Sequence, residues 1–158
     1  SMRNRILLLI CGLLMCIAAQ AQVETDFAEN YLKLYATNTS LYCTTVSPMM
    51  INRMLLMKTL PKDRQAQQAL PCIKRVRIVS NNNANETSGL FDKAKSLLQQ
   101  NSDRFAHYND YDGKTIYVRR KGDTIVEAVL LTKTEGRLYV VDVTGNMTEA
   151  VIKSLINS

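Results

Sequence analysis

The stretch Thr115–Thr144, "TIYVRRKGDTIVEAVLLTKTEGRLYVVDVT", decides the fold. It contains three runs rich in β-branched residues, separated by Gly122-Asp123 and Glu135-Gly136. Links this short join antiparallel neighbours. We therefore predict an antiparallel meander with strands at 115–121, 124–132 and 137–144.

The middle run of the meander, "TIVEAVLL", has apolar residues at both odd- and even-numbered positions. A strand of this kind is covered on both faces, so we predict that it is interior. The run before it alternates, with Ile116 and Val118 on one face and Tyr117 and Arg119 on the other.

Residues on both sides of the meander supply the remaining elements. Periodic apolar positions predict helices at 25–36, 48–58, 87–100 and 147–156, and β-branched runs predict strands at 41–46, 72–79 and 105–108. The predicted class is α+β: a mixed, mainly antiparallel sheet of about five to six strands with a C-terminal meander and about four helices packed on it.

The first segment has the pattern of a signal peptide. Arg3 and Arg5 precede an apolar run, Ile6 to Ala19, that is too short to cross a bilayer permanently and ends in Ala19-Gln20-Ala21. We expect residues 1–21 to be removed, which leaves a single α+β domain at 22–158 in the periplasm or outside the cell.

Two details of this segment bear on how it is processed. Cys16 follows an apolar stretch, as in a lipoprotein, but Met15 stands where a lipobox has a small residue, so plain secretion is favoured over lipid anchoring. Ser1, ahead of Met2, is read as an added residue.

The mature chain is mildly basic. Removing the signal leaves 18 Lys and Arg against 14 Asp and Glu, a formal net charge of +4, which weakly favours anionic partners. Its cysteines, Cys43 and Cys72, would enter an oxidising compartment and form a candidate disulfide, with two free buried thiols as the open alternative.

Basic residues recur on two predicted strands. Arg75 and Arg77 share one strand face, and Tyr117, Arg119 and Lys121 share another. If those faces coincide, they form an anion-binding strip for phosphate, lipid headgroups or acidic glycan, although a solvated sheet face is commoner. Export disfavours nucleic acid as the partner.

Methionines gather in the predicted helix that begins at Pro48. Met50, Met54 and Met57, with Met49, suit either core packing, the favoured interpretation, or a partner-binding surface. Copper is disfavoured because the one histidine lies in a distant segment.

His107 is that histidine. A small hydrolase or thiol-redox protein would use it with Cys43 or Cys72, but no local motif supports a catalytic residue. The segment "HYNDYDGK" departs from a calcium loop at two ligand positions, so we predict no metal and no cofactor.

At the end of the meander, we predict a turn at Gly145-Asn146 that leads into the last predicted helix. Asn146 and Glu149 fit a capping box, which explains the motif without a ligand. Asp142 is a lone acid within an apolar strand.

Four segments carry a family resemblance: "FAENYLKLY", "TTVSPMMINRMLLM", "KTIYVRRKGDTIVEAVLL" and "LYVVDVTGNMTEAVIKSL". Together they resemble DUF4252, a domain-of-unknown-function family of small exported proteins of Bacteroidetes. The resemblance covers nearly all of the mature chain and implies a Gram-negative envelope protein. It carries over no catalytic residues.

The sequence therefore favours an exported cell-envelope protein that acts as a non-enzymatic interaction or sensory and regulatory module with an envelope protein as its partner. The alternatives are the small periplasmic hydrolase or thiol-redox protein and a binder of anionic lipid or glycan. The oligomeric state is left open.

Overall fold

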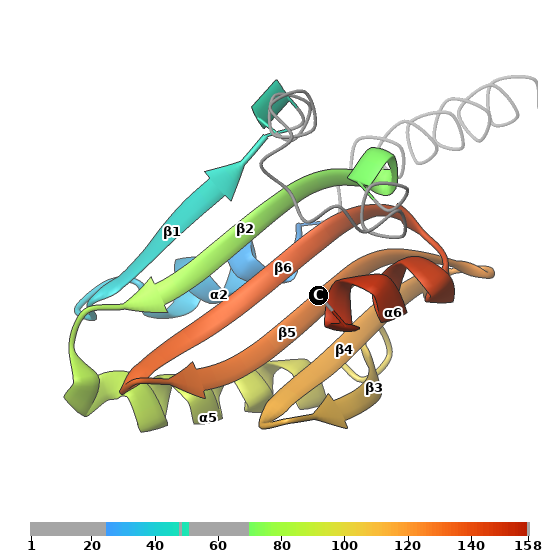
Figure 1. The fold of residues 1–158 in the computed structure, drawn as a ribbon. Helices are drawn as coiled ribbons and strands as arrows, with labels where there is room; N and C mark the ends of the chain where they lie inside the picture. Colours follow the sequence, from blue (N-terminus) through green and yellow to red (C-terminus); the bar gives the residue numbers. More distant parts are fainter. Residues whose placement is uncertain (1–24, 48, 51–69, 158) are drawn as a thin grey trace, which may run out of the picture.

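The computed structural model describes residues 25–47, 49–50 and 70–157. They form one six-stranded sheet in the order β1-β2-β6-β5-β4-β3, and every neighbouring pair is antiparallel (Figure 1). The strands are β1 (Leu41–Val46), β2 (Ile73–Asn81), β3 (Ala106–Tyr111), β4 (Lys114–Lys121), β5 (Thr124–Thr134) and β6 (Arg137–Met147).

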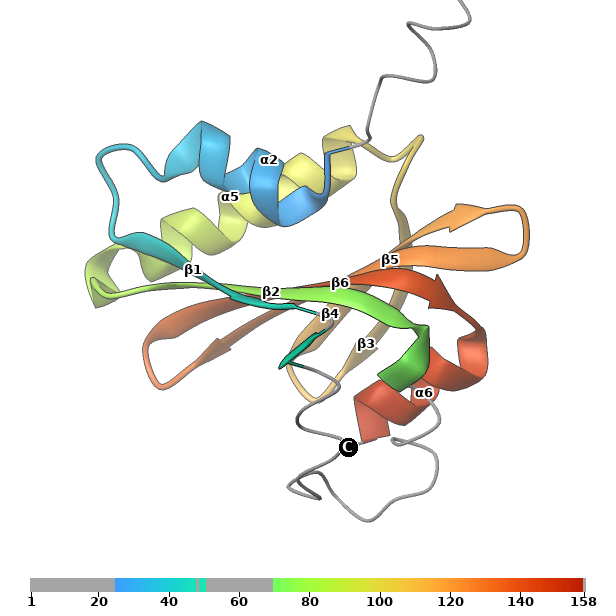
Figure 2. The ribbon, with the colours of Figure 1, turned by 90° about the horizontal axis from the view of Figure 1, so that it is seen from above.

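Helices cover both faces of this sheet. α2 (Phe27–Tyr35) and α5 (Thr87–Gln100) lie on one face, and α6 (Glu149–Asn157) lies on the other (Figure 2). Two 3-10 turns, η1 (Leu70–Cys72) and η2 (Ala84–Glu86), precede β2 and α5. Within the described ranges no helix has the length and apolar character needed to span a membrane.

The sheet separates two apolar cores. Val129 and Leu131 of β5 pack in the core beneath α2 and α5, whereas Ala128 and Leu130 pack in the core on the α6 side. Burying alternate side chains on opposite faces requires apolar residues at both parities. The prediction that this strand is interior is confirmed, because β5 pairs with β4 and with β6.

Most predicted elements are confirmed. The meander, the strand at 41–46 and the helix at 87–100 are present, and the predicted strand at 105–108 extends over Ala106–Tyr111. The described residues contain three α-helices where about four were predicted, since the predicted helix at 48–58 lies mostly outside them.

The predicted turn at Gly145-Asn146 is wrong. β6 continues through it to Met147, because Gly145 still pairs with Ile73 of β2 and Met147 pairs with Ile125 of β5. A register shift between Ile125 and Glu127 accommodates the residues that looked like a turn.

The predicted capping box of Asn146 and Glu149 is therefore also wrong. Thr148 occupies the capping position of α6: its hydroxyl oxygen accepts a hydrogen bond from the Val151 N–H at 3.4 Å. Glu149 is the first residue of the helix and pairs with Arg120 instead.

Asn81 ties the polar loop after β2 to the rest of the fold. Its side chain is fully buried; Nδ2 donates to the Thr87 hydroxyl at 2.9 Å, and Oδ1 accepts from the Leu138 N–H at 2.9 Å. The Thr87 hydroxyl in turn donates to the Gly136 carbonyl. These bonds hold the start of α5 against the β5–β6 hairpin.

Candidate functional site

The start of α2 rests on two carboxyl groups from the sheet. The Phe27 N–H donates to Glu127 Oε2 at 2.8 Å, and the Ala28 N–H donates to Asp142 Oδ2 at 2.8 Å. The first amides of a helix have no acceptor within the helix itself. Here acceptors on β5 and β6 supply the missing partners across 100 and 114 residues of sequence.

Asp26 completes this arrangement as the N-cap of α2. Its Oδ1 accepts from the Glu29 N–H at 2.8 Å, and it also accepts hydrogen bonds from Arg75 and Arg77 of β2. Only 3% of the Asp26 side chain is exposed, so the two arginines compensate its lost hydration. We call Asp26, Glu127 and Asp142 the carboxyl platform.

Glu127 has an arginine of its own. Arg119 Nε donates to Glu127 Oε1 at 3.0 Å, with 11% of the Arg119 side chain and none of the Glu127 side chain exposed. The carboxylate thus links a β4 cation to the first amide of α2.

Asp142 is the third carboxyl group of the platform, and its surroundings disfavour its ionised form. Burial, and then the hydrogen bond and negative charge of Glu127, raise the pKa of Asp142 well above its usual value.

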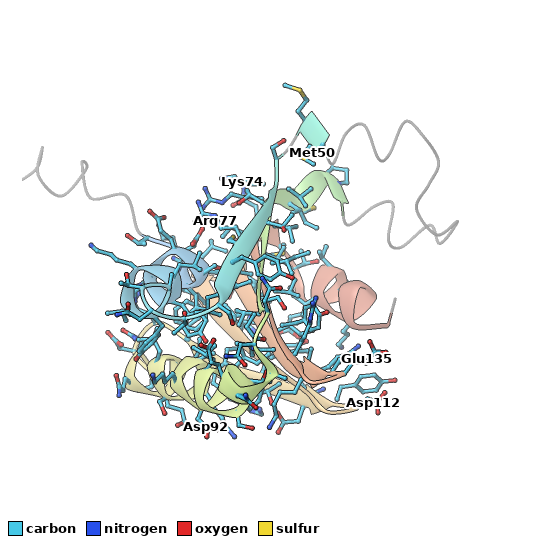
Figure 3. All side chains as sticks on the ribbon, turned by 90° about the vertical axis from the view of Figure 1, so that its left-hand side faces the viewer. Met50, Lys74, Arg77, Asp92, Asp112 and Glu135 are labelled. Carbon is cyan, nitrogen blue, oxygen red and sulfur yellow. The ribbon has the colours of Figure 1, made fainter. Side chains whose placement is uncertain are left out.

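A cavity of about 400 Å³ opens beside the platform. We define the basic pocket by its cationic lining residues: Lys74, Arg75, Arg119 and Lys121. Lys74 and Arg75 both reach it because the β2 register shifts between Ile73 and Arg75. In Figure 3, Lys74 and Arg77 lie at one end of the molecule, away from Asp92, Asp112 and Glu135.

The predicted anion-binding residues divide into two groups. Arg75, Arg119 and Lys121 meet at the basic pocket, whereas Arg77 is recorded only in ion pairs with Asp26 and Glu29. Tyr117 is buried in the core beneath α2 and α5, so its place in the predicted strip is wrong.

Cys43 and Cys72 are both free thiols, so the candidate disulfide is not formed. Cys43 is exposed and Cys72 is half-buried, so the alternative of two buried thiols does not hold either. Cys43 pairs with Val79, seven residues along the chain from Cys72, which corresponds to about 23 Å along a strand. A disulfide requires Cα atoms within about 7 Å.

His107 also lies far from Cys43. β3 and β1 form opposite edges of the sheet, which places them about 24 Å apart at five strand spacings. His107 Nε2 instead contacts Asp110 Oδ1 at 3.0 Å, and this hydrogen bond is the main cause of a lowered Asp110 pKa. The pair lines an open cleft of about 520 Å³ that holds no cysteine.

The β1 edge is a separate surface. Residues 42–45 are exposed, and beyond the strand Met49 and Met50 expose 65% and 47% of their surface. Met54 and Met57, which are candidates with Met50 for a partner-binding surface, lie outside the described residues.

Comparison with known families identifies the chain. The model of a domain of unknown function, DUF4252, matches residues 35–155. The chain belongs to the DUF4252 family. The match extends from the last residue of α2 into α6 and so includes the two sheet carboxyls of the platform. The family predicted from the sequence resemblance is confirmed. No curated protein and no solved structure matches the chain.

Sequence reasoning missed Asp26 and Glu127. The signals were an aspartate three residues before Glu29 at a helix start, which fits an N-cap, and a single acid inside the apolar run "TIVEAVLL". Asp142 was noted for the same reason, but its contact with α2 was not predictable from sequence.

Replacing Glu127 tests how strongly the platform holds this DUF4252 protein together. Glu127→Gln removes the negative charge of the buried ion pair with Arg119, so we expect the free energy of unfolding to fall by about 3 kcal/mol or more. Urea denaturation measures the change.

Glu149→Gln is the matched control. Arg120 Nη2 and Glu149 Oε1 also lie 3.0 Å apart, but the two side chains are 36% and 56% exposed. This substitution should change the unfolding free energy by less than about 1 kcal/mol. Equal losses in the two variants would contradict the assigned role of burial.

Asp142→Asn tests whether the folded state raises the pKa of Asp142. Because the folded state raises the Asp142 pKa, the folded protein binds this proton more tightly than the unfolded chain, and stability falls as pH rises above the unfolded carboxyl value. Asparagine has no such proton. The stability of the variant relative to the native protein should therefore increase from pH 5 to pH 8, measured by urea denaturation.

Asp112→Asn, at an exposed turn, serves as the control for this pH series. Its stability curve should run parallel to that of the native protein. A parallel curve for Asp142→Asn as well would show that Asp142 is not held protonated.

Proposed function

We propose that this protein is an exported, non-enzymatic interaction module of the cell envelope, and that β1 receives an extended segment of a protein partner. The proposal of export rests on the signal-peptide pattern of residues 1–21. The proposal of strand addition rests on one observation: the two edges of the sheet differ in how they are protected.

The β1 edge lacks the usual protection against pairing. A terminal strand exposes unpaired backbone N–H and C=O groups, and charged residues, proline or bulges normally block them. β1, "LYCTTV", contains neither a charge nor a proline, and its register with β2 is unbroken over six residues. Such a strand can pair with an added strand by main-chain hydrogen bonds.

The β3 edge has the protection that β1 lacks. It carries His107 and the charged Asp110, and its register with β4 shifts between His107 and Asn109. A bulge and charged groups disfavour another strand there. The contrast between the two edges supports β1, rather than β3, as the edge that receives the partner.

Apolar side chains beside β1 would add affinity. Tyr42 is 38% exposed, and the exposed Met49 and Met50 follow the strand in sequence. Met50 lies beyond the end of β1 (Figure 3). Methionine adapts to varied partner surfaces. Main-chain pairing at β1 with apolar contacts at these residues suits a protein partner of the envelope.

The alternative of a thiol hydrolase or redox enzyme receives less support. Its candidate groups lie on separate elements: Cys43 on β1, Cys72 in η1 before β2, and His107 on β3 at the opposite edge of the sheet. A nucleophile and its base must approach within hydrogen-bond reach.

Placing lysines on the β1 edge tests the proposal. Tyr42→Lys/Thr44→Lys introduces two charges on one face of β1, which should abolish capture of the partner from a native envelope fraction. Hydrogen exchange of residues 41–46 should slow in the native complex, because their edge amides become bonded.

The control places the same charges on the opposite edge. Tyr111 is 50% exposed on β3, so Tyr111→Lys/Asn109→Lys should retain the partner. Equal loss in both variants, or unchanged exchange at residues 41–46, would contradict strand addition at β1.

A further inference from the structure

We propose that the basic pocket is a binding site for a phosphate group, carried either by a soluble phosphoester or by a phospholipid headgroup. This inference is independent of the β1 edge. It rests on the arrangement of side chains around the cavity beside the carboxyl platform.

The pocket gathers cations from strands that are distant in sequence. Lys74 and Arg75 come from β2, and Arg119 and Lys121 come from β4. β6 and β5 lie between those strands in the sheet, and Gly145 and its neighbours on β6 supply the pocket lining between the two pairs of cations. Cations therefore approach the cavity from two sides.

Cations outnumber carboxylates in the lining of the pocket. Lys74, Arg75, Arg119 and Lys121 line it together with one carboxylate, Asp26, which Arg75 and Arg77 bind. Such a lining favours an anion, and phosphate oxygens accept charge-assisted hydrogen bonds from arginine and lysine.

The two arginines are held in place before a ligand arrives. Asp26 accepts from Arg75, and Glu127 accepts from Arg119 Nε. The Arg75 side chain nevertheless remains 39% exposed. An arginine fixed by a carboxylate loses little further rotamer freedom on binding, and its planar fork suits phosphate oxygens.

The Asp26 carboxylate, Val126, two neutral polar side chains and a glycine line the rest of the cavity. Thr144 and Asn146 of β6 line it with polar side chains. A Cβ atom on Gly145 would lie 2.1 Å from the Cys72 carbonyl oxygen, so glycine is required where β6 passes η1. The volume of about 400 Å³ accommodates a phosphate together with part of the molecule that bears it.

The test uses the two lysines, because Arg75 and Arg119 also support the fold. Inorganic pyrophosphate is titrated into the purified protein by calorimetry at low salt, and vesicles of phosphatidylglycerol and phosphatidylcholine are sedimented with it beside vesicles of phosphatidylcholine alone. Lys74→Gln/Lys121→Gln should weaken binding by at least about tenfold. Raising the salt concentration should weaken it as well.

The control has the same loss of charge elsewhere. Lys33 near the end of α2 and Lys153 on α6 are exposed, and Lys33→Gln/Lys153→Gln should change affinity by less than about twofold. Pyrophosphate binding would identify a soluble phosphoester ligand, and binding only to the anionic vesicles would identify a headgroup. Absence of both, or equal losses in the two variants, would overturn the proposal.

Discussion

The hydrogen bonds between two buried carboxyl groups of the sheet and the first amides of α2 organise this structure. The first two amides of α2 have no acceptors within the helix, and the carboxyl groups of Glu127 and Asp142 are buried away from solvent. The amides donate hydrogen bonds to the carboxyl oxygens, and these bonds fix α2 across β5 and β6. Apolar packing alone would position a helix less specifically, because apolar contacts are not directional.

The carboxyl platform explains why so many cations gather at one end of the sheet. Asp26 and Glu127 are buried carboxyl groups, and they pair with arginines from β2 and β4. Lys74 and Lys121 line the cavity beside them. The basic pocket is thus part of the arrangement that holds α2, and the family match includes the strands that carry it.

Local sequence signals predicted the sheet well. Alternating apolar residues and glycine-containing links specify the meander, and the two-faced apolar pattern of "TIVEAVLL" places β5 inside the sheet, since both signals lie within a few residues. The same approach failed at Gly145-Asn146, where a strand pairing replaced an expected turn. Gly145 serves close backbone approach there, which depends on Cys72 in another segment.

The site itself was only partly predictable because its contacts are non-local. Arg75, Arg119 and Lys121 were recognised as cations on strands, but only the strand order shows that they meet. Tyr117 shares a face with Arg119, and yet the position of α2 and α5 buries it. Glu127 and Asp142 reach α2 over 100 residues or more, a distance at which no periodic pattern carries information.

Amide hydrogen exchange at the start of α2 tests the central claim most directly. First-turn amides of an exposed helix exchange quickly because they lack acceptors. If Glu127 and Asp142 hold α2 as described, the Phe27 and Ala28 amides will exchange as slowly as the core amides of β5 and β6. Fast exchange at these two residues, with the rest of α2 protected, would contradict the account.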